Sequence, residues 1–394
     1  MQRIMNKYAL LLFSVFCAGF LMFSLYACVN AEIEDNKGKR NILFYIGGDN
    51  SLGYEPRQKI DEMRKGWQPG KGEMLIYVDQ RDSDAYLLRI TDEQEENGYY
   101  ILDTLETYVN DNSADCAVLS RVVDEVVNGF PADSYGMIFF SHASGWLPEG
   151  MLAHPRSLVI DGSDGPPAEM EYYDFAAAIP DKTFDFIIIE ACLMADVMSM
   201  YELRHKADYI LASPAEIVSP GFTTIYMENV MGLFNKKQSV EVLLKEFANA
   251  YCKKDKNYNF YTLSILKMSE MDALAEVTKT ILKGKAIGEE NLTMAGMQTF
   301  DRPNALIVSG TKRSRYFDLG HTLSCLVSES EYNTFNNQLR KTVVWKEATD
   351  SFLPGHSGFY VSYYSGLTTY IKQSVFPELN EAFENSSWYK AILP

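Results

Sequence analysis

Two residues with reactive side chains each follow an apolar, strand-like stretch. His142 follows "GMIFFS" and Cys192 follows "FIIIEA". In an open parallel sheet the carboxyl ends of neighbouring strands meet at one edge, so we expect the two side chains to lie close together. A thiol near a helix N-terminus gains thiolate character, and an imidazole can take its proton. The two residues are therefore a candidate Cys–His dyad for acyl transfer.

Each of these residues also has an ordinary structural interpretation. A cysteine after a buried strand is commonly a small core residue. A histidine at the end of a strand is commonly a hydrogen-bonding residue of its loop. Residue types and spacing alone leave both interpretations open.

The elements that must position the dyad are predicted by hydrophobic patterning. Continuous apolar runs without polar alternation predict buried strands at 40–48, 73–80, 134–142, 185–192 and 207–213. Helix-like stretches separate them, for example at 115–131. We therefore predict an α/β fold, with a mostly parallel sheet sandwiched between helices.

Two further elements are predicted close to these strands. The stretches "AYLLRIT" and "GYYILDT" predict a hairpin joined by an acidic loop. Apolar residues at helical spacing predict a helix immediately after Cys192: Leu193, Val197, Met200 and Tyr201. That helix would place the thiol at its N-terminus.

The domain organisation is predicted from where this patterning weakens. Residues 41–284 carry the clear alternation and form the predicted catalytic domain. In 285–394 the pattern is irregular, with late strands predicted at "TVVWK" and "GFYVSYY". This part is either a C-terminal α+β extension of the same sheet or a small appended subdomain.

Composition and charge restrict the class of protein. Of the 394 residues 47% are hydrophobic and 23% are charged, which is typical of a globular protein. Lys and Arg total 36 against 53 Asp and Glu, a formal net charge of -17. Such an acidic surface repels phosphate backbones, so we expect no nucleic-acid partner.

The N-terminus indicates the compartment. Residues 1–27 combine two basic residues with an uncharged apolar run, and "LYAC" at the end of this segment resembles a bacterial lipobox. We predict a lipoprotein signal peptide at 1–27, lipidation of Cys28 and a tether at 28–40, which would anchor the protein in the bacterial cell envelope. The run is also long enough for an uncleaved transmembrane anchor, which is the alternative.

The remaining cysteines do not form a recognisable framework. They are widely spaced and contain no CxxC pair: Cys116, Cys192, Cys252 and Cys325. We therefore predict neither a zinc site nor a disulfide scaffold.

Several short strings resemble the clostripain-type cysteine peptidases, which are relatives of caspases, legumains and gingipains. "SHASGW" resembles their His-Gly-Ser-Gly-Trp element, and "EACLMA" resembles their Asp-Ala-Cys-Leu-Met-Ala element. "FYIGGDNSL", "ADYILASPAEIVSPGF", "HSGFYVSYY" and "SSWYKAIL" resemble further segments in the same order. The matches spread over some 340 residues of the mature chain.

The resemblance implies a caspase-like fold and a role for each matched residue. His142 would be the general base and Cys192 the nucleophile. The backbone N–H groups of Ala143 and Cys192 would hold the oxyanion. Candidate substrate-binding residues lie at the two strand ends and in the loop beyond: Trp146, Glu190 and Ser213.

Three departures from the family pattern affect these expectations. Ala143 replaces the glycine after the histidine, which would cost about 1 kcal/mol if that backbone needs a positive φ. Glu190 replaces Asp and is one methylene longer. The stretch 219–226 lacks the acid expected in a pocket for Arg or Lys, and the flanking Glu216 and Glu228 are expected to be solvated. Cleavage after basic residues is therefore in doubt, and a less polar preference is the alternative.

The long Pro- and Gly-rich connection between the two dyad strands carries two further expectations. Relatives are processed in this region, so Arg156 is a candidate self-cleavage site; an intact loop is the alternative. Relatives also respond to calcium, for which Asp161 and Asp164 offer carboxylates. No cofactor is expected for the chemistry, and no histidine is assigned to a metal.

The sequence thus favours a lipid-anchored cysteine endopeptidase that acts on proteins or peptides as a monomer. The alternative is a catalytically impaired, surface-bound binding protein on the same scaffold, because a fold can persist after its chemistry is lost.

Overall fold

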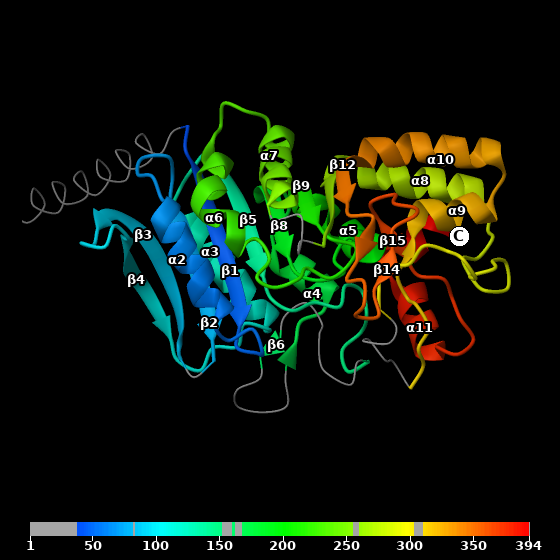
Figure 1. The fold of residues 1–394 in the computed structure, drawn as a ribbon, viewed down its shortest axis with the longest axis horizontal. Coiled ribbons are helices and arrows are strands. Elements are labelled where there is room, and N and C mark those ends of the chain that lie inside the picture. The colour runs from blue at the N-terminus through cyan, green and yellow to red at the C-terminus, as the bar shows by residue number, and fades with distance from the viewer. Residues whose placement is uncertain are drawn as a thin grey trace, which may run out of the picture.

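The computed structural model describes residues 38–81, 83–151, 160–161, 168–254, 260–302 and 310–393. These residues form a nine-stranded mixed sheet of order β12-β10-β9-β8-β5-β1-β2-β3-β4 (Figure 1). Its strands are β1 (Arg40–Gly48), β2 (Met74–Gln80), β3 (Ala85–Gln94), β4 (Tyr100–Tyr108), β5 (Ser134–Phe140), β8 (Phe184–Glu190), β9 (Ala207–Ala212), β10 (Thr262–Lys267) and β12 (Val343–Ala348).

The centre of the sheet is parallel. The strands β2, β1, β5, β8 and β9 pair parallel to one another, whereas β3, β4, β10 and β12 add antiparallel strands at the two sides. The predicted parallel sheet and the hairpin of β3 and β4 are therefore confirmed. All nine residues of β1 are buried, because helices cover both faces.

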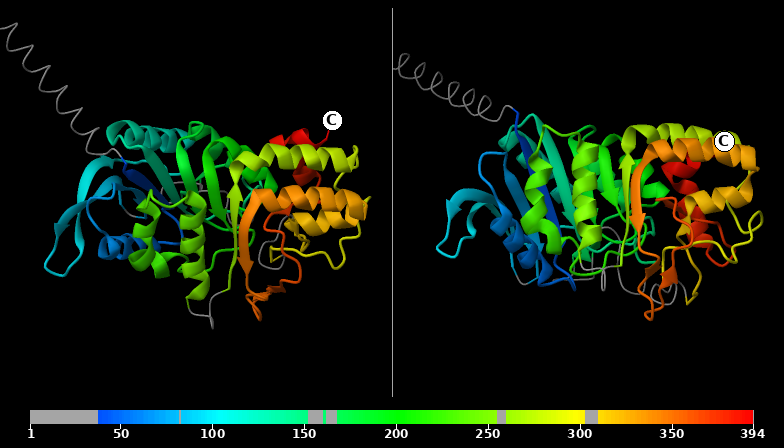
Figure 2. Two further views of the ribbon diagram at one scale, coloured as in Figure 1. Left: turned by 90° about the horizontal axis from the view of Figure 1, so that it is seen from above. Right: turned by 45° about the horizontal axis from the view of Figure 1, so that its top comes forward.

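Two hydrophobic clusters lie on the two faces of the sheet. One face is covered by α2 (Glu55–Gly66), α6 (Thr223–Asn229), η2 (Val230–Phe234) and α7 (Val240–Lys253). The other is covered by α3 (Cys116–Gly129), α4 (Tyr172–Ala178) and α5 (Val197–Glu202), and its core continues into the C-terminal helices. Figure 2 shows the sheet between these helices.

The C-terminal part packs at one end of this sandwich. It contains α9 (Leu319–Leu326), α10 (Glu329–Thr342), α11 (Pro377–Asn385) and α12 (Ser387–Ile392), and α10 and α12 pack against the preceding α8 (Met271–Leu282) (Figures 1 and 2). Because β12 pairs antiparallel with β10 and these helices share the core of α3 to α5, the described residues 285–302 and 310–393 extend the main sheet and its core.

The remaining short elements connect or cap the main ones. They are the strand pairs β6 (Ile160–Asp161) with β7 (Ala168–Glu169), β11 (Phe317–Asp318) with β15 (Thr368–Thr369) and β13 (Ser351–Phe352) with β14 (Phe359–Tyr360), and the turns η1 (Leu203–His205) and η3 (Met268–Glu270). The late strand predicted at "GFYVSYY" is thus reduced to the two residues of β14.

Some expectations lie outside the described residues: the signal peptide, the tether up to residue 37, Cys28, Arg156 and Asp164. In the part of the chain that the structure describes, no helix has the length and apolar character needed to cross a membrane.

Candidate active site

The two dyad residues emerge from neighbouring strands at the same edge of the sheet. Strands β5 and β8 pair in parallel, with Phe140 opposite Glu190. His142 and Cys192 each lie two residues beyond this pair, and both line a pocket with a volume of about 280 Å³. The predicted approach of these two strand ends is therefore what the sheet register produces.

The imidazole of His142 is held from the end of β1. The Ser51 hydroxyl lies 2.9 Å from His142 Nε2. The neighbouring Ser141 hydroxyl donates to the carbonyl of Gly47 at 2.8 Å, which ties the β5 loop to the end of β1. Ser51 was not predicted as a site residue; its only sequence signal is its position just after a buried strand.

The thiol of Cys192 faces the loop that follows β9. The Ile217 N–H donates to Cys192 Sγ at 3.4 Å. The Leu193 N–H donates to the Ala215 carbonyl at 2.9 Å, and the Ala195 N–H donates to Ser213 O at 2.9 Å. The loop therefore runs beside the turn that carries Cys192 and forms one wall of the pocket.

The prediction that a helix starts immediately after Cys192 is wrong. Helix α5 begins at Val197, with Asp196 as its N-cap. The strand-like hydrogen bonds of Leu193 and Ala195 hold the intervening residues, and Leu193 has a φ of +62°, which a right-handed helix excludes. Cys192 therefore lies in a turn, so the stabilisation expected from a helix N-terminus is replaced by the Ile217 N–H.

The backbone of the histidine loop requires a glycine at position 145 and does not require one at position 143. Ala143 is buried and does not have a positive φ, so its methyl group causes no backbone strain. Gly145 has a φ of +58°, and a Cβ there would lie 2.5 Å from the carbonyl oxygen of Leu193. The histidine and cysteine loops therefore pack backbone to backbone at Gly145.

Glu190 lines the pocket but is engaged by the protein itself. Its Oε1 accepts hydrogen bonds from Lys59 Nζ at 2.7 Å and the Phe222 N–H at 2.5 Å, and its Oε2 accepts one from the Tyr226 hydroxyl at 2.5 Å. Burial raises the pKa of the Glu190 carboxyl, and the charge of Lys59 opposes this shift. These contacts fix the loop after β9 against α2.

The structure places Ser213 and Trp146 in the protein interior, outside the pocket lining. The Ser213 hydroxyl lies 2.9 Å from Thr262 Oγ1 and 3.0 Å from the carbonyl of Ala215, to which it donates. The Trp146 ring packs against three aromatic rings of the C-terminal part, those of Tyr316, Tyr370 and Phe383. The expected substrate contacts therefore give way to core packing at these two positions.

An ion pair that the sequence did not indicate lies across the pocket. Arg302 Nη2 lies 2.5 Å from Glu216 Oε2, and the two side chains are 18% and 11% exposed. The expectation that Glu216 is solvated is therefore wrong, because a distant arginine folds onto it. Glu228, 63% exposed and 4.0 Å from Lys254 Nζ, is close to the expected solvated charge.

The described residues contain neither a group that could hold a metal ion nor a disulfide. Within those ranges no group of three or more His, Cys, Asp or Glu is arranged to hold a metal ion. The calcium expectation rests on Asp161, described by its backbone alone, and on Asp164, which is not described. None of the four cysteines in the described ranges forms a disulfide.

Solved structures of two bacterial cysteine proteases are similar to this chain. An inactive zymogen C11 protease from Parabacteroides distasonis is 29% identical with a TM-score of 0.75, over 90% of this chain and 98% of that one. A secreted C11 cysteine protease from Bacteroides thetaiotaomicron, in complex with an irreversible peptide inhibitor, is 26% identical with a TM-score of 0.74 over 90% and 98%. No curated protein matches. The clostripain family model matches residues 44–389, so the chain belongs to this family of cysteine peptidases.

Proposed function

We propose that the protein hydrolyses peptide bonds within proteins through Cys192 and His142. The Cys192 sulfur attacks the scissile carbonyl carbon while His142 takes the thiol proton, and His142 then protonates the leaving amine. A water molecule, deprotonated by His142, attacks the resulting thioester and releases the carboxylic acid and the free thiol. The observation that carries the proposal is the position of both side chains at adjacent strand ends, on one pocket.

The backbone N–H groups of Ala143 and Cys192 are the proposed oxyanion donors. Both lie in turns directly beyond the parallel pair β5 and β8. Among the described residues no acceptor is hydrogen-bonded to the Ala143 N–H. Donors of this kind stabilise the negative charge that develops on the carbonyl oxygen.

The experiment that tests this proposal is cleavage of a peptide library by the purified protein and its variants. We expect Cys192→Ala and His142→Ala to abolish cleavage, and Cys325→Ser, at an exposed cysteine, to retain it. Cleavage by both dyad variants at the parent rate would refute the mechanism.

The structure removes the main argument for the alternative, a catalytically impaired binding protein. It rested on Ala143 and on the missing acid in the loop, but Ala143 causes no strain and both dyad residues line the pocket. The peptide inhibitor in the structure of the relative from Bacteroides thetaiotaomicron also supports a peptide substrate.

We also propose attachment to the bacterial cell envelope through a lipid on Cys28. Arg40 starts β1, at the sheet edge opposite to the carboxyl ends that carry the dyad. An anchor on the preceding tether therefore leaves the active-site edge accessible. Cys28→Ser should move the protein from the detergent fraction to the aqueous fraction, and unchanged partitioning would contradict the lipid anchor.

Self-cleavage, calcium dependence and a monomeric state remain predictions. Mass spectrometry of the purified protein with calcium or with a chelator should show whether the chain is cut after Arg156. Light scattering on the same samples gives the oligomeric state. An intact chain of unchanged activity under both conditions would contradict the first two predictions.

A further inference from the structure

A fully buried lysine neutralises the acid at the pocket beside the nucleophile. The side chains of Lys59 and Glu190 are 0% and 1% exposed, and Lys59 Nζ lies 2.7 Å from Glu190 Oε1. Lys59 Nζ also donates to Thr223 Oγ1 at 2.8 Å and to the Pro220 carbonyl at 3.2 Å. A buried charge is tolerated only when it is paired in this way, so neither group is available to a substrate.

The other two acids of this pocket also have protein partners. Glu55 accepts a hydrogen bond from the Ser219 hydroxyl at 2.6 Å, and its second oxygen lies 3.7 Å from Lys59 Nζ. Glu216 is paired with Arg302. The three carboxylates of the pocket thus share two cations, and a basic substrate side chain would lose its hydration to meet carboxylates that already have protein partners.

The rest of the pocket offers apolar surface. Its apolar lining comes from the end of β5 and from loops around the dyad: Leu52, Phe140, Ala191, Ile217, Val218 and Leu353. A pocket with such walls and paired charges favours a side chain that brings no charge of its own.

We propose that Lys59 makes this peptidase select peptides with an uncharged, apolar residue before the cleaved bond. The inference rests on the proposed function and deepens it. Lys59 is a specificity-determining residue that acts through Glu190, since the pair removes the carboxylate that a basic side chain would need.

The test is the side-chain preference of the parent and of Lys59→Met. We expect kcat/KM of the parent to be at least tenfold higher for leucine or norleucine than for lysine or arginine. Lys59→Met leaves Glu190 without its cation and should raise the ratio of basic to apolar cleavage at least tenfold. Lys65→Met is the matched control, because Lys65 is on the same helix, exposed at the surface and paired with Glu62 instead of Glu190.

The double variant Lys59→Met/Glu190→Gln removes both charges and should return the apolar preference. A parent that prefers lysine or arginine overturns this inference while the proposed function stands, and that measurement needs no variant to fold. A parent that is folded but cleaves no peptide and reacts with no peptide probe contradicts the proposed function, and the inference with it.

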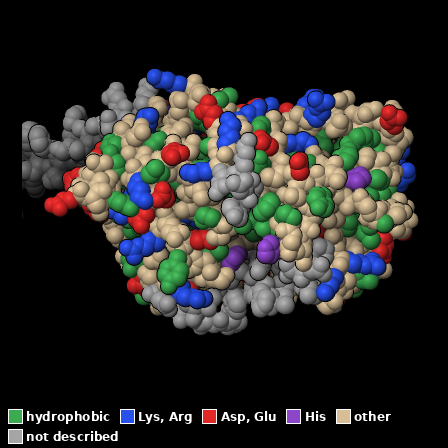
Figure 3. Space-filling view, in the orientation of Figure 1, with side chains coloured by type: hydrophobic (Ala, Val, Ile, Leu, Met, Phe, Trp, Pro, Cys, Tyr) green, Lys and Arg blue, Asp and Glu red, His purple; other side chains and the backbone are tan. Residues whose placement is uncertain are grey.

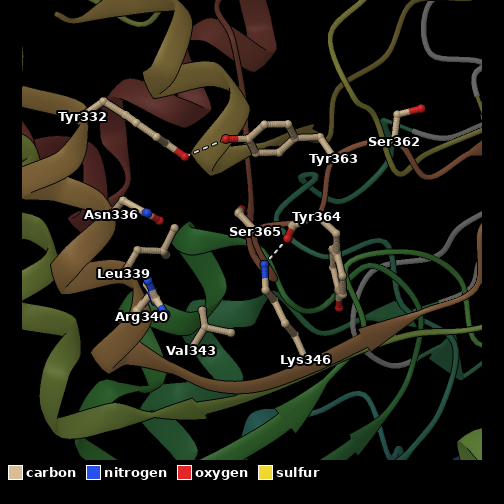
Figure 4. Close-up of a pocket in the computed structure, with 10 residues that line it drawn as sticks. All are labelled: Tyr332, Asn336, Leu339, Arg340, Val343, Lys346, Ser362, Tyr363, Tyr364 and Ser365. Carbon is tan, nitrogen blue, oxygen red and sulfur yellow. Dashed lines mark hydrogen bonds between the residues drawn. The ribbon is translucent and has the colours of Figure 1, made fainter. Parts of the chain in front are cut away.

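A second, independent observation concerns a pocket in the C-terminal part. It has a volume of about 330 Å³ and lies between α10, the start of β12 and residues 362–365 (Figure 4). Arg340 and Lys346 line it, and no acid does. In a chain with a net charge of -17, two cations on one cavity without a carboxylate are unusual.

The cations of this pocket are not neutralised by their surroundings. Among the residues that line this pocket with Arg340 and Lys346 there is no carboxylate to pair with them. Lys346 donates to the Tyr364 carbonyl, and burial lowers the pKa of its ammonium group, with Arg340 acting in the same direction. The charge of Asp318 opposes this lowering of the Lys346 pKa. The Asp318 carboxylate itself accepts hydrogen bonds from the N–H groups of Ser365 and His321.

Further hydrogen-bond donors line the same cavity. The Asn336 amide and the Ser362 hydroxyl form no hydrogen bond with another described residue, and Figure 4 shows both among the lining side chains. The Tyr332 and Tyr363 hydroxyls lie 2.6 Å apart on one side of the pocket. Two cations and several neutral donors form a set suited to an oxyanion.

We infer that this pocket binds an oxyanion, a carboxylate or a phosphate, away from the dyad. Inorganic phosphate and a short acetylated aspartyl peptide are the two probes, and the tighter one identifies the source. Calorimetry on the parent should show saturable binding that is at least tenfold weaker in Arg340→Gln. Lys341→Gln, which removes the same charge from the next residue of the helix, should bind like the parent.

Equal binding by Arg340→Gln and Lys341→Gln overturns this second inference. The absence of saturable binding of either probe, beyond a sodium chloride control of matched ionic strength, overturns it as well. Because Arg340 is exposed, its replacement leaves the packed core intact.

Discussion

The hydroxyl of Ser51 holds the imidazole of His142 from outside its own loop. Ring orientation and tautomer depend on the partner of the second nitrogen, so Ser51 acts as a positioning residue. We expect Ser51→Ala to lower kcat by roughly 2- to 10-fold, the effect of one hydrogen bond, and to shift the acid limb of the pH–rate profile.

Ser83→Ala is the control for this variant, because the Ser83 hydroxyl is exposed and donates to the neighbouring Asp84 carbonyl, away from the site. An unchanged kcat and pH profile in Ser51→Ala would show that the histidine is oriented by other contacts.

Gly145 is where the loops that carry His142 and Cys192 touch, and this gives a second prediction. Gly145→Ala puts a methyl group 2.5 Å from the Leu193 carbonyl at a φ of +58°. We expect a loss of roughly 1–3 kcal/mol in the free energy of unfolding, together with a loss of activity. Urea unfolding measures the first effect.

Gly150→Ala isolates the contact from the backbone conformation. Gly150 also has a positive φ, +73°, but a Cβ there meets nothing within 4 Å. It should cost about 1 kcal/mol or less. Equal losses of unfolding free energy in Gly145→Ala and Gly150→Ala would mean that the close approach of the loops does not contribute to stability.

At the scale of elements, the cap of α5 predicts a pH dependence of stability. Burial raises the pKa of Asp196 to about 7. The folded state therefore keeps a proton that the unfolded state releases near its ordinary value of 3.8. The free energy of unfolding should then fall as pH rises from about 4 to about 7 and stay low above that.

Asp196→Asn keeps the shape and removes the titration. Urea unfolding at pH 5 and pH 8 should show a smaller loss for this variant than for the parent, by about 1 kcal/mol or more. A parent whose free energy of unfolding rises from pH 5 to pH 8 by more than that of Asp196→Asn would contradict a raised pKa at Asp196.

The sequence predicted the strands of the site better than the turns. Continuous apolar runs identify β5 and β8 because these strands are buried on both faces. The helix after Cys192 was misplaced by four residues, since apolar spacing cannot reveal that Leu193 adopts a positive φ and pairs with Ala215.

Long-range pairing is the part of the site that sequence patterns miss. Lys59 lies on the buried face of α2 with Ile60 and Met63, so a lysine within an apolar stripe was a usable signal. Nothing local indicates that its partner is Glu190, 131 residues away. The pairing of Glu216 with Arg302, 86 residues apart, has no local signal either.

At the scale of the whole molecule, the parallel sheet separates the two ends of its strands. The dyad lies at the carboxyl edge, whereas Arg40 opens β1 at the other edge. Acidic and basic side chains are interspersed over the face shown in Figure 3, so this face has no extended field of one sign.

The core that supports the site extends through most of the described chain. Trp146, four residues beyond His142, packs on rings contributed by the C-terminal part. Tyr316 and Tyr370 of the C-terminal part therefore support the histidine loop directly, which the weak patterning of that region did not indicate.

Site-resolved labelling by a peptidyl acyloxymethylketone tests the central claim most directly. The claim is that a thiol and an imidazole act on one carbonyl from adjacent strand ends. Peptide mapping should locate the label on Cys192, with a labelling rate in His142→Ala at least 100-fold below that of the parent and of Cys325→Ser. Labelling at another cysteine, or equal rates with and without the imidazole, would contradict it.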